Sequence, residues 1–248
     1  MCQLLGMNCT VPTDICFSFR GFHHRGGRTA DHDDGFGIAF FEDAGCRVFI
    51  DAQSAVDSPI AALIADYPSR SMNVIAHIRN ATQRAVALVN THPFVRELWG
   101  RYWIFAHNGN LENFDPEPGD HFRPVGATDS EKAFCLMLQT LRMRHPQGEP
   151  PLPELYGTLA ALSEALARHG TFNYMLSNGE YLFAHCSTKL AFVQRKAPFA
   201  VAHLKDEDMA VDFSEVTTPD DRVAVIATEP LTVNEAWTAF RPGDLRVF

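Results

Sequence analysis

The sequence predicts an α+β fold in which mostly antiparallel sheets are covered by helices. Segments with strand signals outnumber segments with helix signals, and they follow one another in groups. A parallel α/β sheet would instead alternate strand and helix along the chain. The 248 residues contain no internal repeat and no linker rich in glycine and serine, and 46% of them are hydrophobic. We therefore expect residues 1–248 to form a single domain with a sizeable core.

Helix signals mark four segments, and the clearest evidence lies at their ends. Ser58 followed by Pro59 supplies an N-cap and a proline at the first helical position. Thr128 and Glu131 have the spacing of a capping box ahead of an apolar run. Gly170 is suited to follow the end of the last helix. The expected helices span residues 13–22, 58–67, 128–143 and 152–169.

Strand signals are runs of β-branched and aromatic residues bounded by turn residues. Between two of these runs, Asn178 and Gly179 predict a hairpin with a type I′ turn. The proline-rich stretch 115–124 is expected to form a loop within the domain. The expected strands span residues 37–41, 47–51, 72–78, 102–106, 172–176, 181–185, 190–195, 222–227 and 244–247.

Charge and hydropathy exclude several classes of partner. The net charge is −9, and the basic residues form no run of the kind that binds nucleic acid. Apolar stretches fall well short of the ~20 residues that a membrane span needs. Residues 1–9 lack the positive start and the long apolar stretch of a signal peptide. We expect a cytoplasmic protein that binds neither nucleic acid nor a membrane.

The six cysteines contain no CxxC pair, which favours free thiols in a reducing compartment over a disulfide framework. We expect five of them to lie in the core. Cys2 differs because removal of Met1 would leave it with both a thiol and a free α-amino group. The ordinary pKa of an α-amine is about 7.7–8.0 and that of a thiol about 8.5. The amine can therefore accept the thiol proton, as in N-terminal nucleophiles.

Four further residues would complete an amide-cleaving site around Cys2. The Asn108 side chain and the Gly109 backbone N–H are suited to stabilise an oxyanion. Arg79 can bind the carboxylate of an amino acid with two hydrogen bonds, and Asp129 can pair with its ammonium. Taken singly, each residue has a simpler explanation: a frayed terminus, a surface ion pair, a turn or a helix cap. Together they meet the needs of one reaction.

Several segments, in the same order along the chain, resemble the motifs of class-II glutamine amidotransferases. The opening Met-Cys-Gln-Leu-Leu-Gly and the stretch ATEPL at 227–231 are similar to the stand-alone, YafJ-type group of that family. The segments that carry the resemblance are HRG at 24–26, GFGIA at 35–39, IAHIRNAT at 75–82, NTHP at 90–93, AHNGNL at 106–111 and TDSE at 128–131.

The resemblance implies a four-layer αββα sandwich of the N-terminal-nucleophile hydrolase type. It also implies that Cys2 attacks the side-chain amide of glutamine, or of another γ-glutamyl compound, and forms a γ-glutamyl thioester that water hydrolyses. No cofactor and no metal are implied. By position, the family's site residues are Cys2, Asn108 and Gly109 for catalysis, Arg79, Thr82, His107 and Asp129 for substrate binding, and Arg25 and Gly26 in a supporting loop.

Some positions depart from the family pattern and leave alternatives open. Asn80 stands where relatives often have tryptophan, and Gln83 and Arg84 stand where they often have His-Gly, so the γ-glutamyl substrate is open. A metal-dependent hydrolase could use the His- and Asp-rich segment 23–34, and a glutamine-binding protein could lack catalysis. We expect a homodimer, and either a separate ammonia-accepting enzyme or simple hydrolysis.

Overall fold

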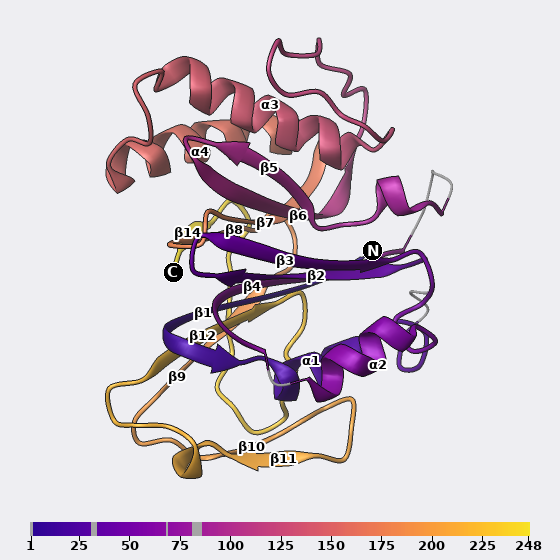
Figure 1. The fold of residues 1–248 in the computed structure, drawn as a ribbon, viewed down its shortest axis with the longest axis vertical. Helices are drawn as coiled ribbons and strands as arrows, with labels where there is room; N and C mark the ends of the chain where they lie inside the picture. Colours follow the sequence, from indigo (N-terminus) through magenta and orange to yellow (C-terminus); the bar gives the residue numbers. More distant parts are fainter. Residues whose placement is uncertain (1, 31–33, 68, 81–85) are drawn as a thin grey trace.

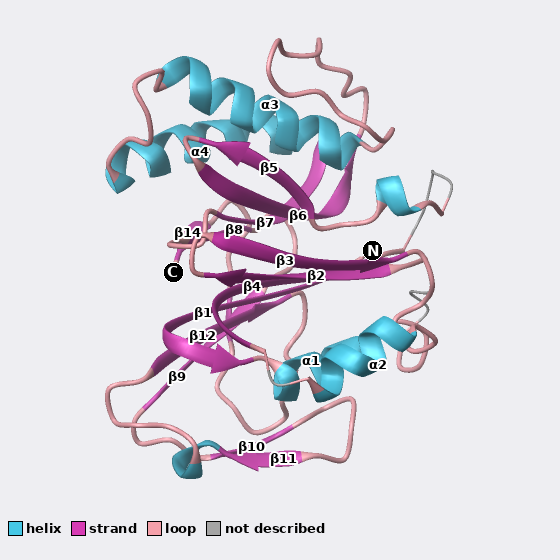
Figure 2. Cartoon of the chain, viewed as in Figure 1, coloured by secondary structure: helices cyan, strands magenta, loops and turns pink. Residues whose placement is uncertain are grey.

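The fold is a stack of two sheets with helices on both outer faces (Figure 1). It is seen in a computed structural model that describes residues 2–30, 34–67, 69–80 and 86–248. Two helices cover the outer face of the upper sheet, and two shorter helices cover the outer face of the lower sheet (Figure 2). This order of layers confirms the expected four-layer αββα sandwich.

The larger sheet of the described residues has seven strands in the order β13-β9-β12-β1-β4-β2-β3. All of its neighbouring strands pair in antiparallel fashion. Its strands are β1 (Gln3–Asp14), β2 (Phe36–Glu42), β3 (Gly45–Asp51), β4 (Arg70–Ile78), β9 (Ala191–Lys196), β12 (Arg222–Ala227) and β13 (Thr238–Ala239).

The smaller sheet has five strands in the described part of the chain, in the order β14-β8-β7-β6-β5, again antiparallel. A two-stranded ribbon, β10 with β11, lies apart from both sheets at the bottom of Figure 1. The bounds are β5 (Phe94–Leu98), β6 (Arg101–Leu111), β7 (Gly170–Ser177), β8 (Leu182–His185), β14 (Leu245–Val247), β10 (Val201–His203) and β11 (Ala210–Asp212).

Helix ends follow the capping residues that the sequence contains. The Ser58 hydroxyl accepts hydrogen bonds from the N–H groups of Ile60 and Ala61, so the expected N-cap is confirmed. The helices are α1 (Cys16–His23), α2 (Pro59–Asp66), α3 (Asp129–Arg144) and α4 (Leu152–Ala167), with short 3₁₀ turns at η1 (Leu88–Asn90) and η2 (Phe213–Glu215). None of the described helices is long and apolar enough to span a membrane.

Alternating side chains fill three apolar layers. On β6, Trp103 and Phe105 pack against α3 and α4, whereas Ile104 and Ala106 point between the two sheets. A third layer joins the larger sheet to α1 and α2. The same alternation continues past residue 106, so successive residues of β6 face opposite sides of the sheet.

The first strand of the chain was not among the expected strands. β1 is paired on both sides, with β12 and with β4, and its residues Leu4 and Leu5 face different apolar layers. A strand buried on both faces lacks the polar alternation by which strands are usually identified. Because β1 continues to Asp14, whose carboxylate accepts the N–H of Cys16 at 2.7 Å, the expected helix start at residue 13 is wrong.

Two smaller expectations also need correction. The hairpin between β7 and β8 is confirmed, but its turn is not type I′, because Asn178 lacks the positive φ that Gly179 has. The Asn178 side-chain oxygen instead accepts the N–H groups of Glu180 and Tyr181. Cys9, Cys135 and Cys186 are buried as expected, whereas Cys16 and Cys46 are partly exposed. Cys16 lies at the start of α1, and Cys46 lies on the edge strand β3.

Candidate active site

A pocket of about 600 Å³ opens where the ends of β1, β4 and β6 meet the first turn of α3. Five of the residues expected at the site line it together: Cys2, Arg79, His107, Gly109 and Asp129. One cavity therefore brings together residues that are distant in the sequence: one before β1, one after β4, two in β6 and one at the start of α3.

The Cys2 thiol lies against the backbone that follows β4. Its Sγ accepts the N–H of Asn80 at 3.3 Å and faces the Asn80 carbonyl oxygen at 3.6 Å. Burial raises the pKa of the Cys2 thiol, while the Asn80 hydrogen bond and the positive charge of Arg79 act in the opposite direction. Since the net shift is upward, the thiol needs a base to become a nucleophile at neutral pH.

On β6, the alternation of side chains separates His107 from Asn108. His107 points toward α3, where its Nδ1 lies 2.8 Å from the Ser130 hydroxyl and its Nε2 lies 3.0 Å from the Thr171 carbonyl oxygen. The carbonyl can only accept, so Nε2 carries the proton and Nδ1 accepts from Ser130. Both ring nitrogens of His107 therefore have protein partners that tie β6 to α3 and β7.

Asn108 points the other way, toward the larger sheet, and is buried. Its side-chain amide lies 3.4 Å from the Thr228 hydroxyl oxygen, measured from Nδ2, and its backbone carbonyl oxygen accepts from Asn173 Nδ2 at 3.0 Å. Asn108 is not among the residues that line the pocket, whereas its neighbour Gly109 is. A Cβ at Gly109 would come within 1.8 Å of the Thr171 carbonyl oxygen, so the backbone passes there only as glycine.

Arg79 and Asp129 carry opposite charges in the pocket, whose described lining also includes Glu112, Asp115 and Lys132. Arg79 follows β4, is 5% exposed, and donates its backbone N–H to the Gly35 carbonyl at 2.8 Å. Asp129 is the first residue of α3, and its Oδ2 accepts the N–H of Leu111 at 2.7 Å. A carboxylate at a helix N-terminus is stabilised by the helix dipole. The pocket can therefore receive a group that carries both a carboxylate and an ammonium.

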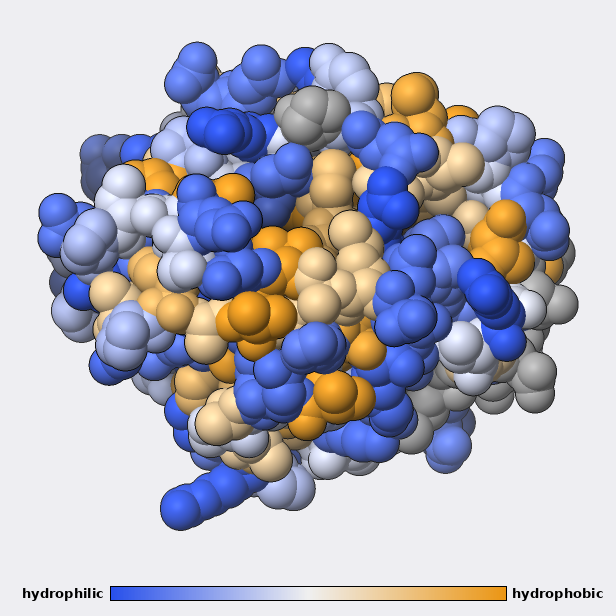
Figure 3. Space-filling model, turned by 90° about the horizontal axis from the view of Figure 1, so that it is seen from below, coloured by the Kyte–Doolittle hydropathy of each residue, from blue (hydrophilic) through white to orange (hydrophobic). Residues whose placement is uncertain are grey.

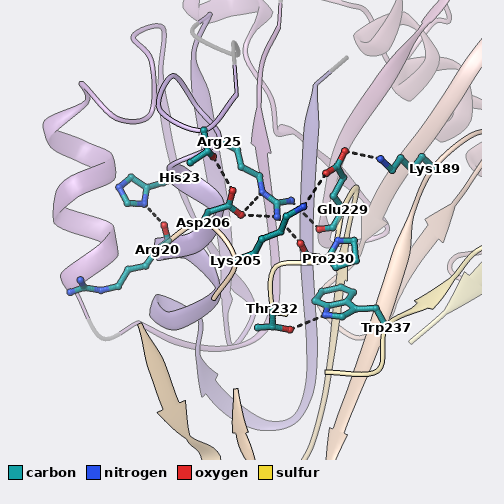
Figure 4. Close-up of polar contacts among 11 residues, drawn as sticks. Arg20, His23, Arg25, Lys189, Lys205, Asp206, Glu229, Pro230, Thr232 and Trp237 are labelled. Carbon is teal, nitrogen blue, oxygen red and sulfur yellow. Dashed lines mark hydrogen bonds and ion pairs between the residues drawn. The ribbon is translucent and has the colours of Figure 1, made fainter. Parts of the chain in front are cut away.

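The expected supporting loop lies outside this pocket. Arg25 is buried and forms an ion pair with Asp206 at 2.8 Å, and its guanidinium donates to the carbonyl oxygens of Glu229 and Pro230. Figure 4 shows these contacts converging on Arg25 from separate parts of the chain. A Cβ at Gly26 would come within 2.6 Å of Ala55 Cβ. The loop thus joins α1 to the segments after β10 and β12.

Several residues that hold the site together were not expected from the sequence. The Thr128 hydroxyl caps α3 by accepting the N–H of Glu131, as expected. The Glu131 carboxylate, however, accepts the N–H groups of Val125 and Gly126 and pairs with Arg96. It therefore fixes the loop before α3. Asn173, which holds the backbone of Asn108, lies in no motif of the sequence, and Thr228 lies in the ATEPL stretch without a role being expected for it.

Two expectations fall partly or wholly on residues that are not described. Thr82 lies outside the described residues, as do Gln83, Arg84 and residues 31–33 of the alternative metal site. Within residues 2–30, 34–67, 69–80 and 86–248, no three His, Cys, Asp or Glu side chains are grouped so that they could hold a metal ion.

The buried histidines predict how stability depends on pH. Burial lowers the pKa of His92 well below its usual value and also lowers that of His185. Below about pH 6.5 these histidines are therefore protonated in the unfolded chain but stay neutral in the folded protein. The free energy of unfolding should fall by up to about 1.4 kcal/mol per pH unit for each such histidine. Urea unfolding at pH 7.5, 6.5 and 5.5 measures this, and a flat profile would contradict it.

Comparison with models of protein families assigns this chain to a family. The model of the class-II glutamine amidotransferases matches residues 1–248. The chain belongs to this family. It is 53% identical over 248 residues to YafJ of Escherichia coli (strain K12), a match that covers 100% of this chain and 97% of YafJ.

Solved structures agree with this assignment. The fold superposes with a TM-score of 0.79 on the crystal structure of a glutamine amidotransferase predicted in Pseudomonas aeruginosa PA01, at 45% identity, covering 99% of this chain and 96% of that one. Glutamine phosphoribosylpyrophosphate amidotransferase of Bacillus subtilis, at 12% identity, shares the fold with a TM-score of 0.54, over 99% of this chain and 48% of that one.

Proposed function

We propose that this class-II family member is an amidohydrolase in which Cys2 attacks the side-chain amide of glutamine or of another γ-glutamyl compound. The observation that supports the proposal is the convergence of Cys2, Arg79, Gly109 and Asp129 on one pocket. A nucleophile, an oxyanion donor and two opposite charges are the groups that the hydrolysis of an amino-acid amide requires.

In the proposed reaction, removal of Met1 frees the α-amine of Cys2, which accepts the thiol proton. The sulfur then forms a bond to the amide carbon, and the carbonyl oxygen becomes an oxyanion. When the oxyanion collapses, the C–N bond breaks and the leaving nitrogen takes the proton from the α-amine, so that ammonia or an amine departs. Water attacks the γ-glutamyl thioester in the second half of the reaction and restores the thiol.

The oxyanion is stabilised by the side-chain NH₂ of Asn108 and the backbone N–H of Gly109. Both groups come from the carboxyl-terminal part of β6, which pairs with β7, so they are oriented before the substrate arrives. Such preorganised donors are typically worth about 10²–10³ in kcat each.

Substrate binding gives a prediction for the two charged residues. Arg79→Gln should raise the KM for glutamine by about 10- to 100-fold with little change in kcat, because a hydrogen bond to a charged group contributes about 1.5–3 kcal/mol. Asp129→Asn should raise KM similarly. For glutaramic acid, which is glutamine without its α-amino group, the Asp129→Asn effect should vanish. Steady-state kinetics measures both, with exposed Arg47→Gln as the control. An equal Asp129→Asn penalty for both substrates would refute the ammonium assignment.

The function is tested by a substrate screen combined with covalent labelling. Intact mass first establishes that Met1 is absent from the active protein. Glutamine, γ-glutamyl amides and γ-glutamyl peptides are then assayed for release of ammonia, amine or glutamate, with and without a chelator. We expect turnover that the chelator does not change, and labelling of Cys2 by a glutamine-like electrophile. Turnover that the chelator abolishes would support the metal alternative, and binding without turnover would support the glutamine-binding alternative.

A further inference from the structure

Thr228 lies between the nucleophile strand and the residue proposed to stabilise the oxyanion. It follows the last residue of β12 and is buried. Its backbone N–H donates to the Leu4 carbonyl at 3.0 Å, and its hydroxyl oxygen accepts the Leu4 N–H at 2.9 Å. The same oxygen lies 3.4 Å from Asn108 Nδ2. One side chain therefore contacts both the strand that begins at Gln3, next to Cys2, and the amide of Asn108.

The hydrogen-bonding capacity of these groups favours one orientation of the Asn108 amide. The Thr228 oxygen already accepts the Leu4 N–H, and the hydroxyl has one proton to donate. Within the described residues, Asn108 Oδ1 is buried and has no hydrogen-bond partner. If the Asn108 amide is turned over so that Oδ1, in place of Nδ2, faces the Thr228 hydroxyl at 3.4 Å, Thr228 can donate to it, and the hydroxyl proton and the orphaned oxygen are both satisfied. The NH₂ group is then free to donate to an oxyanion.

We infer that Thr228 is a positioning residue for the oxyanion hole. This inference rests on the proposed function, since it acts through Asn108 on the reaction at Cys2. The Thr228 hydroxyl holds the Asn108 amide with its NH₂ directed toward the oxyanion. Through Leu4, it also fixes the spacing between that amide and the start of β1. The Asn173 side chain hydrogen-bonds the backbone carbonyl of Asn108, whereas Thr228 contacts the Asn108 side chain. Thr228 therefore orients the side-chain amide.

Two variants at this position separate the hydroxyl from the volume of the side chain. Thr228→Val keeps the volume and removes the hydroxyl, whereas Thr228→Ser keeps the hydroxyl. We expect Thr228→Val to lower kcat by about 10²-fold, near the lower end for loss of an oxyanion donor. The KM should stay within about threefold, since Thr228 lies outside the pocket that contains Arg79 and Asp129. Thr228→Ser should restore kcat to within about fivefold of the parent enzyme.

Control measurements distinguish positioning from a general structural defect. Thr158→Val removes another buried hydroxyl, on α4, whose oxygen lies 3.2 Å from Nε2 of His145 at the end of α3, and should leave kcat unchanged. Alkylation of Cys2 by iodoacetamide forms no oxyanion, so its rate should be the same in Thr228→Val as in the parent enzyme. A slower alkylation together with a raised KM would show that β1 has moved, and would overturn the inference.

A double mutant tests whether Thr228 acts through Asn108. In an Asn108→Ala background, Thr228→Val should lower kcat no further, because the amide that it orients is absent. Additive losses would overturn the inference, and so would an active parent enzyme whose Thr228→Val variant keeps full kcat. A parent enzyme that hydrolyses no γ-glutamyl amide would instead refute the proposed function, so the two failures are distinguishable.

Discussion

Cys2→Ala should abolish the release of ammonia from glutamine, or of amine from another γ-glutamyl compound, with a loss of roughly 10⁴-fold or more. The proposed thioester cannot form without the sulfur, and no other thiol lines the described part of the pocket. Binding should survive, because Arg79 and Asp129 remain. The substrate should therefore still raise the midpoint of thermal unfolding of the variant.

The matched control for this prediction is Cys16→Ala. Cys16 is also a partly exposed free thiol, but it lies at the start of α1, where its Sγ contacts the Tyr67 carbonyl oxygen at 3.2 Å. Cys16→Ala should retain full activity and remain labelled at Cys2 by a glutamine-like electrophile. If Cys2→Ala kept the activity of the parent enzyme, the N-terminal nucleophile mechanism would be wrong.

Gly109→Ala should both destabilise the protein and inactivate it. The added Cβ would lie 1.8 Å from the Thr171 carbonyl oxygen and 2.6 Å from His107 Nε2. Relief requires β6 to move away from β7, which breaks the pairing of Gly109 with Phe172 and loosens His107. We expect a loss of about 3–5 kcal/mol in the free energy of unfolding, in the range of the most disruptive single substitutions. Urea unfolding measures this loss.

Gly157→Ala provides the opposite case within the same protein. Gly157 lies inside α4, and a Cβ there would meet nothing within 4 Å. Alanine should therefore stabilise the protein by about 0.5–1 kcal/mol through its higher helix propensity. A Gly109→Ala variant as stable as the parent protein would show that β6 can shift away from β7. The backbone N–H of Gly109 would then not be held in a fixed position.

Local signals predicted the parts of the fold that local interactions determine. The N-caps Ser58 and Thr128 each place a side-chain oxygen next to unpaired N–H groups, so the starts of α2 and α3 could be found from a few residues. Cys2, Arg79 and Asp129 could be named because their charges and chemistry suit one substrate. Their convergence depends on sheet pairing, which single-residue patterns do not encode.

The rest of the site depends on contacts between distant residues. The Asn108-Gly109 pair is a frequent turn signal, yet it lies within β6 because residues 104–111 of β6 pair continuously with β7. The ion pair of Arg25 with Asp206 joins segments separated by 181 residues. The face of the molecule that carries β10 and β11 shows hydrophobic side chains between hydrophilic ones (Figure 3).

The position of β1 in the middle of its sheet also limits the order in which its strands can pair during synthesis. The hydrogen bond from Leu4 to Thr228 closes across 224 residues. During synthesis at ~5–20 residues per second, roughly 10 to 45 s therefore pass between the synthesis of Leu4 and that of Thr228. β4, which comes much earlier, can pair with β1 in that interval. A ribosome-bound chain would thus hold β1 paired with only one of its two neighbours until the last third of the chain has emerged.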